Sequence, residues 1–408
     1  MPQAEGGPNT PNMHPFHIHV PDSDIAELRQ RLRQTRWLPE VPGSEWLYGV
    51  DLRFLQELCQ YWASEFDWRE IEAALNGFPQ YRTTITAWNG EALSIHLIHR
   101  RSSRADARPL LIQHGWPSSV YEFYKIIDAL AEPDDPATPA FHVIAPSLPG
   151  YGWSSIPHRS GIGPAAIADM WIELMAQLGY DRFCYHGGDW GAAVGGQLAL
   201  RHPHQIEQIH LTAAALGPPG AAARPQTEEE VRFFRDEQSP YIRDDAAHRF
   251  IHGTRFQTLS FGLSDSPVGL AAWIVDKWWM LSDCMRPEEA PRGGDIYRRF
   301  TRDELLATAS IYWFTQTINS SMRIYHEAMR SSAEIEAEIG GQVVLREGQR
   351  TSVPAGFGKL VRGTPHPPRS WCERAFNVSH WTEFPEGGHF PAMEIPDLLL
   401  TDLRTYFA

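Results

Sequence analysis

The spacing of apolar residues predicts helices over the first part of the chain. Behind the capping residues Asp22 and Asp24, Ile25, Leu28 and Leu32 recur at intervals of three and four, as on one face of a helix. Amphipathic runs follow at 52–66 and 68–75, and the Pro-, Gly- and Trp-rich stretch 37–48 between them and the first helix predicts an irregular segment. We therefore expect a polar, disordered tail over 1–15 and an N-terminal helical meander over 16–82.

From residue 83 the period becomes that of β-strands. Alternating runs at 84–88 and 93–98 flank an Asn-Gly pair, which predicts a hairpin. Short apolar runs at 110–113, 142–145, 183–185 and 206–211 are typical of buried parallel strands. The stretches 120–130 and 190–201 are typical of the crossover helices that join such strands. The pattern predicts an α/β fold with a mostly parallel central sheet flanked by helices.

Strand character is lost after residue 217 and returns near 331. Residues 270–280 and 305–329 have helical spacing, so the segment 218–330 is predicted as a helical lid over an active site. Apolar runs at 342–344, 351–353 and 381–384 predict a return to the sheet, and 396–407 a terminal helix. The core is thus expected in two parts, 83–217 and 331–408.

Composition narrows the class of partner. A chain of 408 residues that is 42% hydrophobic can bury a large core. Its net charge of -14, without a long Lys/Arg run, opposes binding to nucleic acid or to an anionic membrane and favours a small uncharged substrate. The 19 Phe and 15 Trp residues suggest a hydrophobic cavity for an aromatic molecule.

The remaining sequence features predict a cytoplasmic protein without metal or cofactor. The four cysteines lie far apart without a CxxC pair, which suits a reducing compartment. The N-terminus lacks an apolar stretch that would anchor it in a membrane. There is no phosphate loop, no dinucleotide fingerprint and no zinc-ligand spacing.

Three short motifs suggest nucleophilic chemistry. In GGDWG (187–191), glycines two positions either side of Asp189 permit a sharp strand-to-helix turn that exposes the carboxylate. A carboxylate nucleophile attacks saturated carbon and forms an alkyl ester. HGWP (114–117) follows a predicted strand, where backbone N–H groups can form an oxyanion hole. GGHF (387–390) follows the last strand and offers His389 as a base.

These motifs stand in order with RW (36–37), PSLPGYG (146–152), DSPVGLAAW (265–273) and GGHFPAME (387–394). With them the chain resembles the microsomal-type epoxide hydrolases, a family of α/β-hydrolases, from residue 15 to 407. The resemblance implies the α/β-hydrolase fold and a two-step reaction. An Asp opens the epoxide to an ester, and a water activated by His hydrolyses that ester. Two lid tyrosines act as acids, and a carboxylate after the penultimate strand orients the His.

Carried over position by position, the resemblance makes Asp189 the nucleophile, His389 the base and Tyr325 one of the two lid acids. It also implies an oxyanion and substrate-binding set that consists of His114, Gly115, Trp116, Pro117 and Trp190.

Two positions depart from the family pattern. The second lid tyrosine falls on His248, whose imidazole is expected to serve as an acid by donating a hydrogen bond. The orienting acid falls on Gly363, which cannot orient an imidazole; losing that acid costs about 10⁴ in turnover in related triads. Glu347 and Glu373 are carboxylates nearby in the sequence that could replace it.

Four hypotheses follow. The first is epoxide opening on a bulky, aromatic-rich small molecule, as in natural-product tailoring, by Asp189, His389, Tyr325 and His248. The second is a cofactor-independent oxygenase in which His389 and Asp189 deprotonate an electron-rich polycyclic aromatic substrate, because that chemistry needs no third triad member. Dehalogenation of an alkyl halide and a purely ligand-holding role also remain open.

Overall fold

The computed structural model describes residues 13–212, 227–285, 289, 293–329 and 350–408. Its centre is a nine-stranded sheet in the order β1-β2-β3-β5-β4-β6-β7-β8-β9. The strands are β1 (His14–Pro15), β2 (Gln80–Thr86), β3 (Ala92–Arg100), β4 (Arg108–Gln113), β5 (Phe141–Pro146), β6 (Phe183–Gly188), β7 (Ile206–Thr212), β8 (Pro354–Lys359) and β9 (Asn377–Glu383). From β5 to β9 all neighbours are parallel, which confirms the predicted fold class.

The antiparallel edge of the sheet contains the predicted hairpin. β2 and β3 pair from Gln80↔Ile98 to Thr86↔Ala92, and Gly90 takes a φ of 75° in the turn. Beyond the hairpin, β1 pairs antiparallel with β2. The expected tail 1–15 lies mostly outside the described residues, but its last two residues form this strand.

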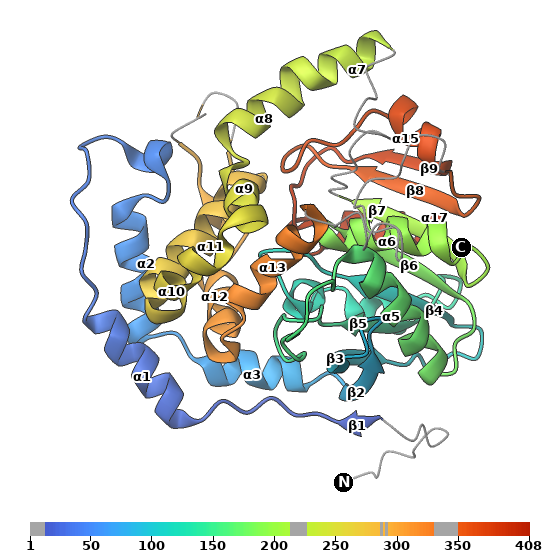
Figure 1. The fold of residues 1–408 in the computed structure, drawn as a ribbon, viewed down its shortest axis with the longest axis horizontal. Coiled ribbons are helices and arrows are strands. Elements are labelled where there is room, and N and C mark those ends of the chain that lie inside the picture. Colours follow the sequence, from blue (N-terminus) through green and yellow to red (C-terminus); the bar gives the residue numbers. More distant parts are fainter. Residues whose placement is uncertain (1–12, 213–226, 286–288, 290–292, 330–349) are drawn as a thin grey trace.

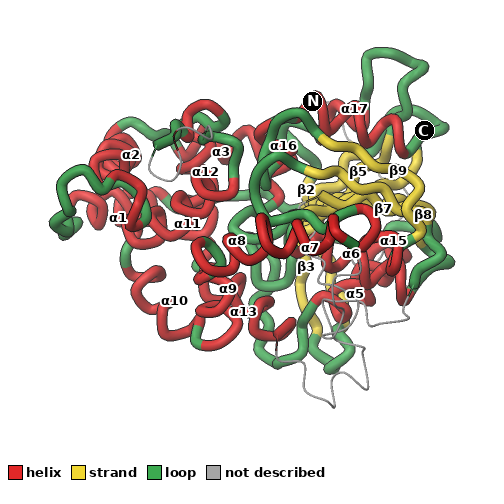
Figure 2. The backbone as a smooth tube through the Cα atoms, turned by 90° about the horizontal axis from the view of Figure 1, so that it is seen from above, coloured by secondary structure: helices red, strands yellow, loops and turns green. Residues whose placement is uncertain are grey.

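Helices cover both faces of the sheet (Figure 2). They are α4 (Ile127–Ala131), α5 (Pro164–Gln177), α6 (Trp190–Arg201), α15 (Arg369–Ala375), α16 (Pro391–Glu394) and α17 (Pro396–Tyr406). Alternate residues of β4 face opposite sides, so Leu111 joins the hydrophobic cluster that includes α5 and α6, whereas Leu110 and Ile112 join the one that includes α4 and α17. Two buried faces explain why the central strands are continuously apolar.

Several predicted elements have different bounds in the structure. The stretch 120–130 forms a 3₁₀ helix (η2, Val120–Phe123) and the short α4, not one crossover helix. The stretch 305–329 is two helices, α12 (Arg302–Thr315) and α13 (Ile318–Met329), because Gln316 takes a left-handed φ of 53° between them. Residues 351–353 precede β8, and 342–344 lie outside the described residues.

The N-terminal helices pack against the inserted helices, away from the sheet (Figure 1). They are α1 (Asp22–Arg33), α2 (Leu52–Ser64) and α3 (Trp68–Asn76), as the periodicity predicts, with a 3₁₀ turn, η1 (Glu45–Tyr48), between the first two. The Trp62 indole donates to the Ser310 hydroxyl at 3.0 Å, and Arg31 forms an ion pair with Asp265 at 3.0 Å. The N-terminal segment therefore braces the helices inserted between β7 and β8.

Those inserted helices are held against the loops at the ends of the central strands. They are α7 (Glu228–Arg232), η3 (Phe233–Gln238), α8 (Ser239–Asp244), α9 (Ala247–Thr254), α10 (Phe256–Asp265), α11 (Pro267–Leu281), η5 (Ile296–Arg298), α12 and α13. The Trp278 indole donates to the Pro117 carbonyl at 3.2 Å, and the Tyr312 hydroxyl to the Ser118 carbonyl at 2.8 Å. Among the described residues, no helix is both long and apolar enough to cross a membrane.

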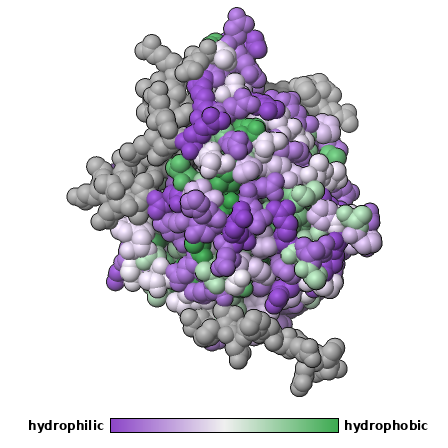
Figure 3. All heavy atoms as spheres, turned by 90° about the vertical axis from the view of Figure 1, so that its right-hand side faces the viewer, coloured by the Kyte–Doolittle hydropathy of each residue, from purple (hydrophilic) through white to green (hydrophobic). Residues whose placement is uncertain are grey.

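Large apolar side chains lie mainly inside the molecule. Trp62, Trp68, Trp171 and Phe357 are among the fully buried ones. Figure 3 shows one side of the surface, where hydrophilic residues cover most of the area and hydrophobic ones occupy smaller areas between them.

A buried polar network ties the C-terminal helix α17 to the sheet. Asp402 accepts from the His210 imidazole at 2.8 Å, from His380 at 2.7 Å and from the Thr382 hydroxyl at 2.6 Å. His210 in turn contacts His186, on the strand that leads to the elbow, at 3.1 Å. Burial would raise the pKa of Asp402, but these hydrogen bonds hold it below its usual value.

Substituting Asp402→Asn should lower the free energy of unfolding by roughly 1.5–3 kcal/mol, because hydrogen bonds to a buried charge are lost. The contribution of a depressed carboxyl pKa is present above the unfolded-state value of about 4 and is lost as pH falls through the folded value, so the difference between variant and wild type should shrink in acid. Urea unfolding at pH 7 and pH 3 measures both effects. Asp134→Asn, at an exposed position, should change stability by less than about 0.5 kcal/mol; equal losses in the two variants would contradict the assignment.

Candidate active site

Asp189 sits on a strained turn between β6 and α6. Its φ of 52° and ψ of -121° are rare for a residue with a side chain. A Cβ on Gly187 would lie 2.7 Å from the Gly191 carbonyl carbon, and one on Gly191 would collide with the Gln113 carbonyl oxygen at the end of β4. The two glycines are therefore needed for the crossing of the chain, as the motif predicts.

The Asp189 carboxylate is held on both of its oxygens. The Trp116 backbone N–H donates to Oδ1 at 2.9 Å, and the His389 Nε2 lies 3.4 Å from Oδ2. Burial would raise the pKa of Asp189, but His389 and the N–H groups of Trp116 and Trp190 outweigh it, and the pKa is below its usual value. The carboxylate is ionised at neutral pH.

His389 lies on the loop between β9 and α16, and the backbone of that loop is fixed by a buried carboxylate. Glu394 accepts from the N–H groups of Gly388 and Phe390, both at 2.9 Å. The His389 N–H donates to the Leu281 carbonyl at 3.0 Å. Burial would lower the pKa of His389, but Asp189 overcomes it and raises that pKa above its usual value.

No carboxylate hydrogen-bonds the other nitrogen of His389 among the described residues. The hydroxyl of Thr364 lies 3.3 Å from Nδ1 instead. Gly363 lies directly beside His389, and a Cβ on Gly363 would be 3.2 Å from the His389 Cβ. Its φ of 108° also disfavours any side chain. A neutral hydroxyl thus contacts the imidazole at the place where the resemblance implies an acid.

The two carboxylates that the sequence suggested as substitutes do not take that role. Glu373 forms an ion pair with Arg369 on α15 at 2.7 Å, and Glu347 lies outside the described residues. Two buried carboxylates, Glu122 and Glu394, do raise the pKa of His389 through space, and burial raises their own pKa to about 7.

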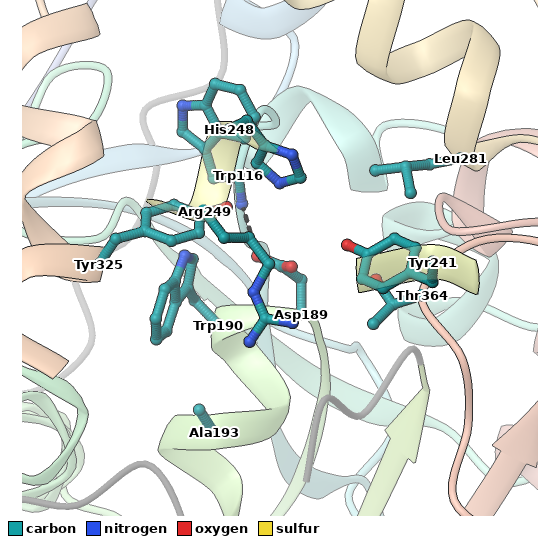
Figure 4. A pocket seen from close by; sticks show the side chains of 10 residues that line it. All are labelled: Trp116, Asp189, Trp190, Ala193, Tyr241, His248, Arg249, Leu281, Tyr325 and Thr364. Carbon is teal, nitrogen blue, oxygen red and sulfur yellow. Dashed lines mark hydrogen bonds between the residues drawn. The ribbon is translucent and has the colours of Figure 1, made fainter. Parts of the chain in front are cut away.

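A pocket opens over Asp189, and the side chains that line it come from the core and from the inserted helices (Figure 4). Its lining consists of Trp116, Asp189, Trp190, Ala193, Tyr241, His248, Arg249, Leu281, Tyr325 and Thr364. No group of three or more His, Cys, Asp or Glu side chains is placed to hold a metal ion in the described part of the chain.

The structure brings Asp189, Tyr325, His248, Trp116 and Trp190 together in this pocket, with His389 facing Asp189 from its buried side. The rest of the predicted oxyanion set is not part of the lining.

His114, Gly115 and Pro117 instead build the turn that carries Trp116. The His114 Nε2 accepts from the Leu148 N–H at 3.2 Å. A Cβ on Gly115 would overlap the Asp189 carboxylate. A cis peptide bond joins Trp116 to Pro117.

Tyr325 and His248 differ in what they can donate. Tyr325, on α13, packs edge-on against Trp190 with ring centres 4.6 Å apart, and burial keeps its pKa well above the usual value, so it stays a phenol. The His248 Nδ1 lies 3.2 Å from the Asp245 carbonyl, which can only accept, so this nitrogen carries the proton. Burial lowers the pKa of His248 well below its usual value, and Nε2 is left as an acceptor. This geometry disfavours the role of acid expected for His248.

Tyr241, Arg249 and Thr364 belong to the pocket but were missed by the sequence reasoning. Tyr241 lies on α8 with its hydroxyl near Thr364, and Figure 4 shows it across the pocket from Tyr325. Arg249 directly follows His248, so the sequence placed it near the predicted site, but the sequence did not show that its side chain points into the pocket. No motif surrounds Tyr241 or Thr364 that could have identified either of them.

The chain is similar to known proteins along most of its length. Residues 13–123 match the family model "Epoxide hydrolase N terminus", and residues 108–279 match "alpha/beta hydrolase fold". A protein from Stigmatella aurantiaca is 38% identical over 96% of this chain and 84% of its own length. Epoxide hydrolase 1 of Sus scrofa is 32% identical over 97% of this chain and 88% of its own length. The crystal structure of juvenile hormone epoxide hydrolase from Bombyx mori superposes with a TM-score of 0.81 at 28% identity and covers 97% of this chain and 93% of its own.

Substituting Asp189→Asn should lower the pKa of His389 by about 1–3, because an opposite charge at this distance shifts a pKa by that much and burial then dominates. The change is measured by NMR titration of the His389 ring proton, assigned with His389→Gln. Asp169→Asn, which breaks an ion pair with His202, is the matched control and should leave His389 unchanged. An unaltered titration in Asp189→Asn would contradict the ion pair.

Proposed function

Because this chain belongs to the microsomal-type epoxide hydrolase family of α/β-hydrolases, we propose that Asp189 opens an epoxide and that a water activated by His389 hydrolyses the resulting ester. The observation that carries the proposal is the ionised Asp189 carboxylate on its strained turn, with a backbone N–H on one oxygen and His389 facing the other. The nucleophile, the residue of the N–H donor and the phenol line one pocket, and the base contacts the nucleophile from its buried side.

In the first step a carboxylate oxygen of Asp189 attacks an epoxide carbon. A carbon–oxygen ester bond forms, the ring carbon–oxygen bond breaks, and the departing ring oxygen takes a proton from a phenol. Tyr325 is one such donor, since burial keeps it protonated.

In the second step His389 removes a proton from water, which attacks the carbonyl carbon of the Asp189 ester. The negative charge that develops on the carbonyl oxygen is stabilised by the Trp116 N–H. The ester bond then breaks, the diol leaves with its new hydroxyl, and the Asp189 carboxylate is restored. Because Thr364 and not a carboxylate contacts the imidazole, the imidazolium is less stabilised and this step limits turnover.

Tyr241 supplies the second acid. Its hydroxyl and that of Tyr325 face the space over Asp189 from opposite sides of the pocket (Figure 4). Burial raises the pKa of Tyr241, although Arg249 and Thr364 partly oppose this effect, so the phenol remains a donor at neutral pH. A phenol from α8 thereby takes the role that the acceptor nitrogen of His248 cannot.

The walls of the pocket favour an epoxide that carries an aromatic group. The indoles of Trp116 and Trp190 and the ring of Tyr325 form much of the lining, and such aromatic walls suit an aromatic ligand. None of the relatives described above is an oxygenase, so the oxygenase alternative has no support from them.

A single turnover in H₂¹⁸O with enzyme in excess tests the ester. Styrene oxide should leave ¹⁸O in the Asp189 carboxylate, because the attacking water oxygen enters the carboxyl group. His389→Gln should accumulate a protein heavier by the mass of the epoxide, and Asp189→Asn should show neither signal. Labelled diol with unlabelled wild-type protein would exclude the mechanism.

Tyr241→Phe should slow ester formation by about 10²-fold, the low end of what a general acid contributes, because Tyr325 still donates. Stopped-flow quenching of tryptophan fluorescence, with Trp116 and Trp190 in the pocket, measures this step. His248→Gln keeps a hydrogen-bond acceptor and should slow ester formation less than Tyr241→Phe does. Tyr180→Phe serves as the control, because the Tyr180 phenol contacts His99 outside the pocket. A larger loss in His248→Gln than in Tyr241→Phe would return the role of acid to His248.

A further inference from the structure

The pocket holds a cationic side chain that neither the fold nor the proposed chemistry requires. Arg249 extends from α9 and lines the same pocket as Asp189 (Figure 4). Among the described residues it forms no ion pair and no side-chain hydrogen bond. Asp189 itself is committed to the Trp116 N–H and to His389.

A shortage of acidic partners does not explain this unpaired charge. The chain has 50 Asp and Glu against 36 Lys and Arg. Several other half-buried arginines bond to acceptors of the protein: Arg299 contacts both Asp283 and Glu386, Arg298 forms an ion pair with Glu289 at 2.6 Å, and Arg82 donates to the Trp153 carbonyl at 2.9 Å. An arginine left unpaired among aromatic walls loses hydration without compensation, unless a ligand supplies the anion.

Arg249 also acts on the groups around the reacting atoms. Its charge lowers the pKa of Tyr241, of Tyr325 and of His248, which places it within reach of all three side chains. An anion bound to it would therefore lie in the same pocket as the epoxide ring.

We infer that Arg249 anchors a carboxylate of the substrate, so that the natural substrate class is an epoxide that bears a carboxylate near the ring and the product is a dihydroxy acid. This inference rests on the proposed function. It revises the expectation of an uncharged substrate, which considered only the net charge of the whole chain. Arginine suits this role because its planar guanidinium forms two parallel hydrogen bonds to a carboxylate.

A monoanion fits this pocket better than a phosphate ester. Arg249 is the one cationic side chain among the described residues that line the pocket, since burial keeps His248 neutral. A single guanidinium neutralises one carboxylate but leaves a dianionic phosphate beside the Asp189 carboxylate with a net negative charge.

Binding of unreactive probes tests the anchor independently of the chemistry. 3-Phenylpropanoate should bind wild-type protein about 10- to 100-fold more tightly than 3-phenylpropanamide, the range expected for hydrogen bonds to a charged group. Calorimetry measures both constants. Arg249→Met should abolish the difference, and Arg249→Lys, which keeps the charge without the planar fork, should keep part of it. Arg255→Met, at an exposed arginine outside this pocket, should leave the ratio unchanged.

Turnover of a matched pair links the anchor to the reaction. The ratio of kcat/KM for 3-phenyloxirane-2-carboxylate to that for its carboxamide should exceed 10 in wild type and fall toward 1 in Arg249→Met. Equal binding of the two probes, or a turnover ratio that Arg249→Met leaves unchanged, overturns the inference alone. Failure to turn over either epoxide, with no label in Asp189, overturns the proposed function, whereas the binding comparison still decides the role of Arg249.

Discussion

The tight crossing of the chain after β6 is the constraint on which the site depends. Gly187, Gly191 and the Gln113 carbonyl approach so closely that no side chain fits at either glycine. This approach holds Asp189 at a φ of 52°, and the strain is tolerated because β4, β6 and α6 are packed on every side. The same turn brings the Asp189 carboxylate against the Trp116 N–H, so backbone packing fixes its position, and this N–H adds to the effect of His389 in lowering its pKa.

The support of His389 is built differently from that of the nucleophile. Its loop is rigid because Glu394 collects the loop N–H groups, but its Nδ1 contacts only the hydroxyl of Thr364. A carboxylate at Gly363 would be strained, since the φ of 108° disfavours a side chain and a Cβ there would lie only 3.2 Å from the His389 Cβ. The charge of Asp189, with Glu122 and Glu394 farther off, keeps the imidazole basic instead. In the proposed mechanism the pair is therefore better equipped to form the ester than to hydrolyse it.

The pocket shows how one changed residue alters the function of its neighbours. Where a phenol is implied, His248 presents an acceptor nitrogen because the Asp245 carbonyl takes its proton. Tyr241 faces the same space from α8, and Arg249 adds a positive charge that makes both phenols stronger acids. These three residues come from adjoining helices of the insertion, so a small change in how those helices pack would change the donors, the charge and the choice of substrate together.

The sequence by itself determined the parallel sheet, the hairpin and the elbow with its two glycines, because these follow from local periodicity and from the steric needs of a tight turn. The pairing of Asp189 with His389 was predicted only through the resemblance to a known family. The sequence also predicted that Gly363 and His248 depart from the family pattern. The tertiary structure decided what fills those gaps. The proton position on His248 depends on a carbonyl three residues away, and Thr364, Tyr241 and Arg249 enter the site only because separate helices and loops converge there. Such convergence depends on packing between distant segments, which leaves no local pattern in the chain.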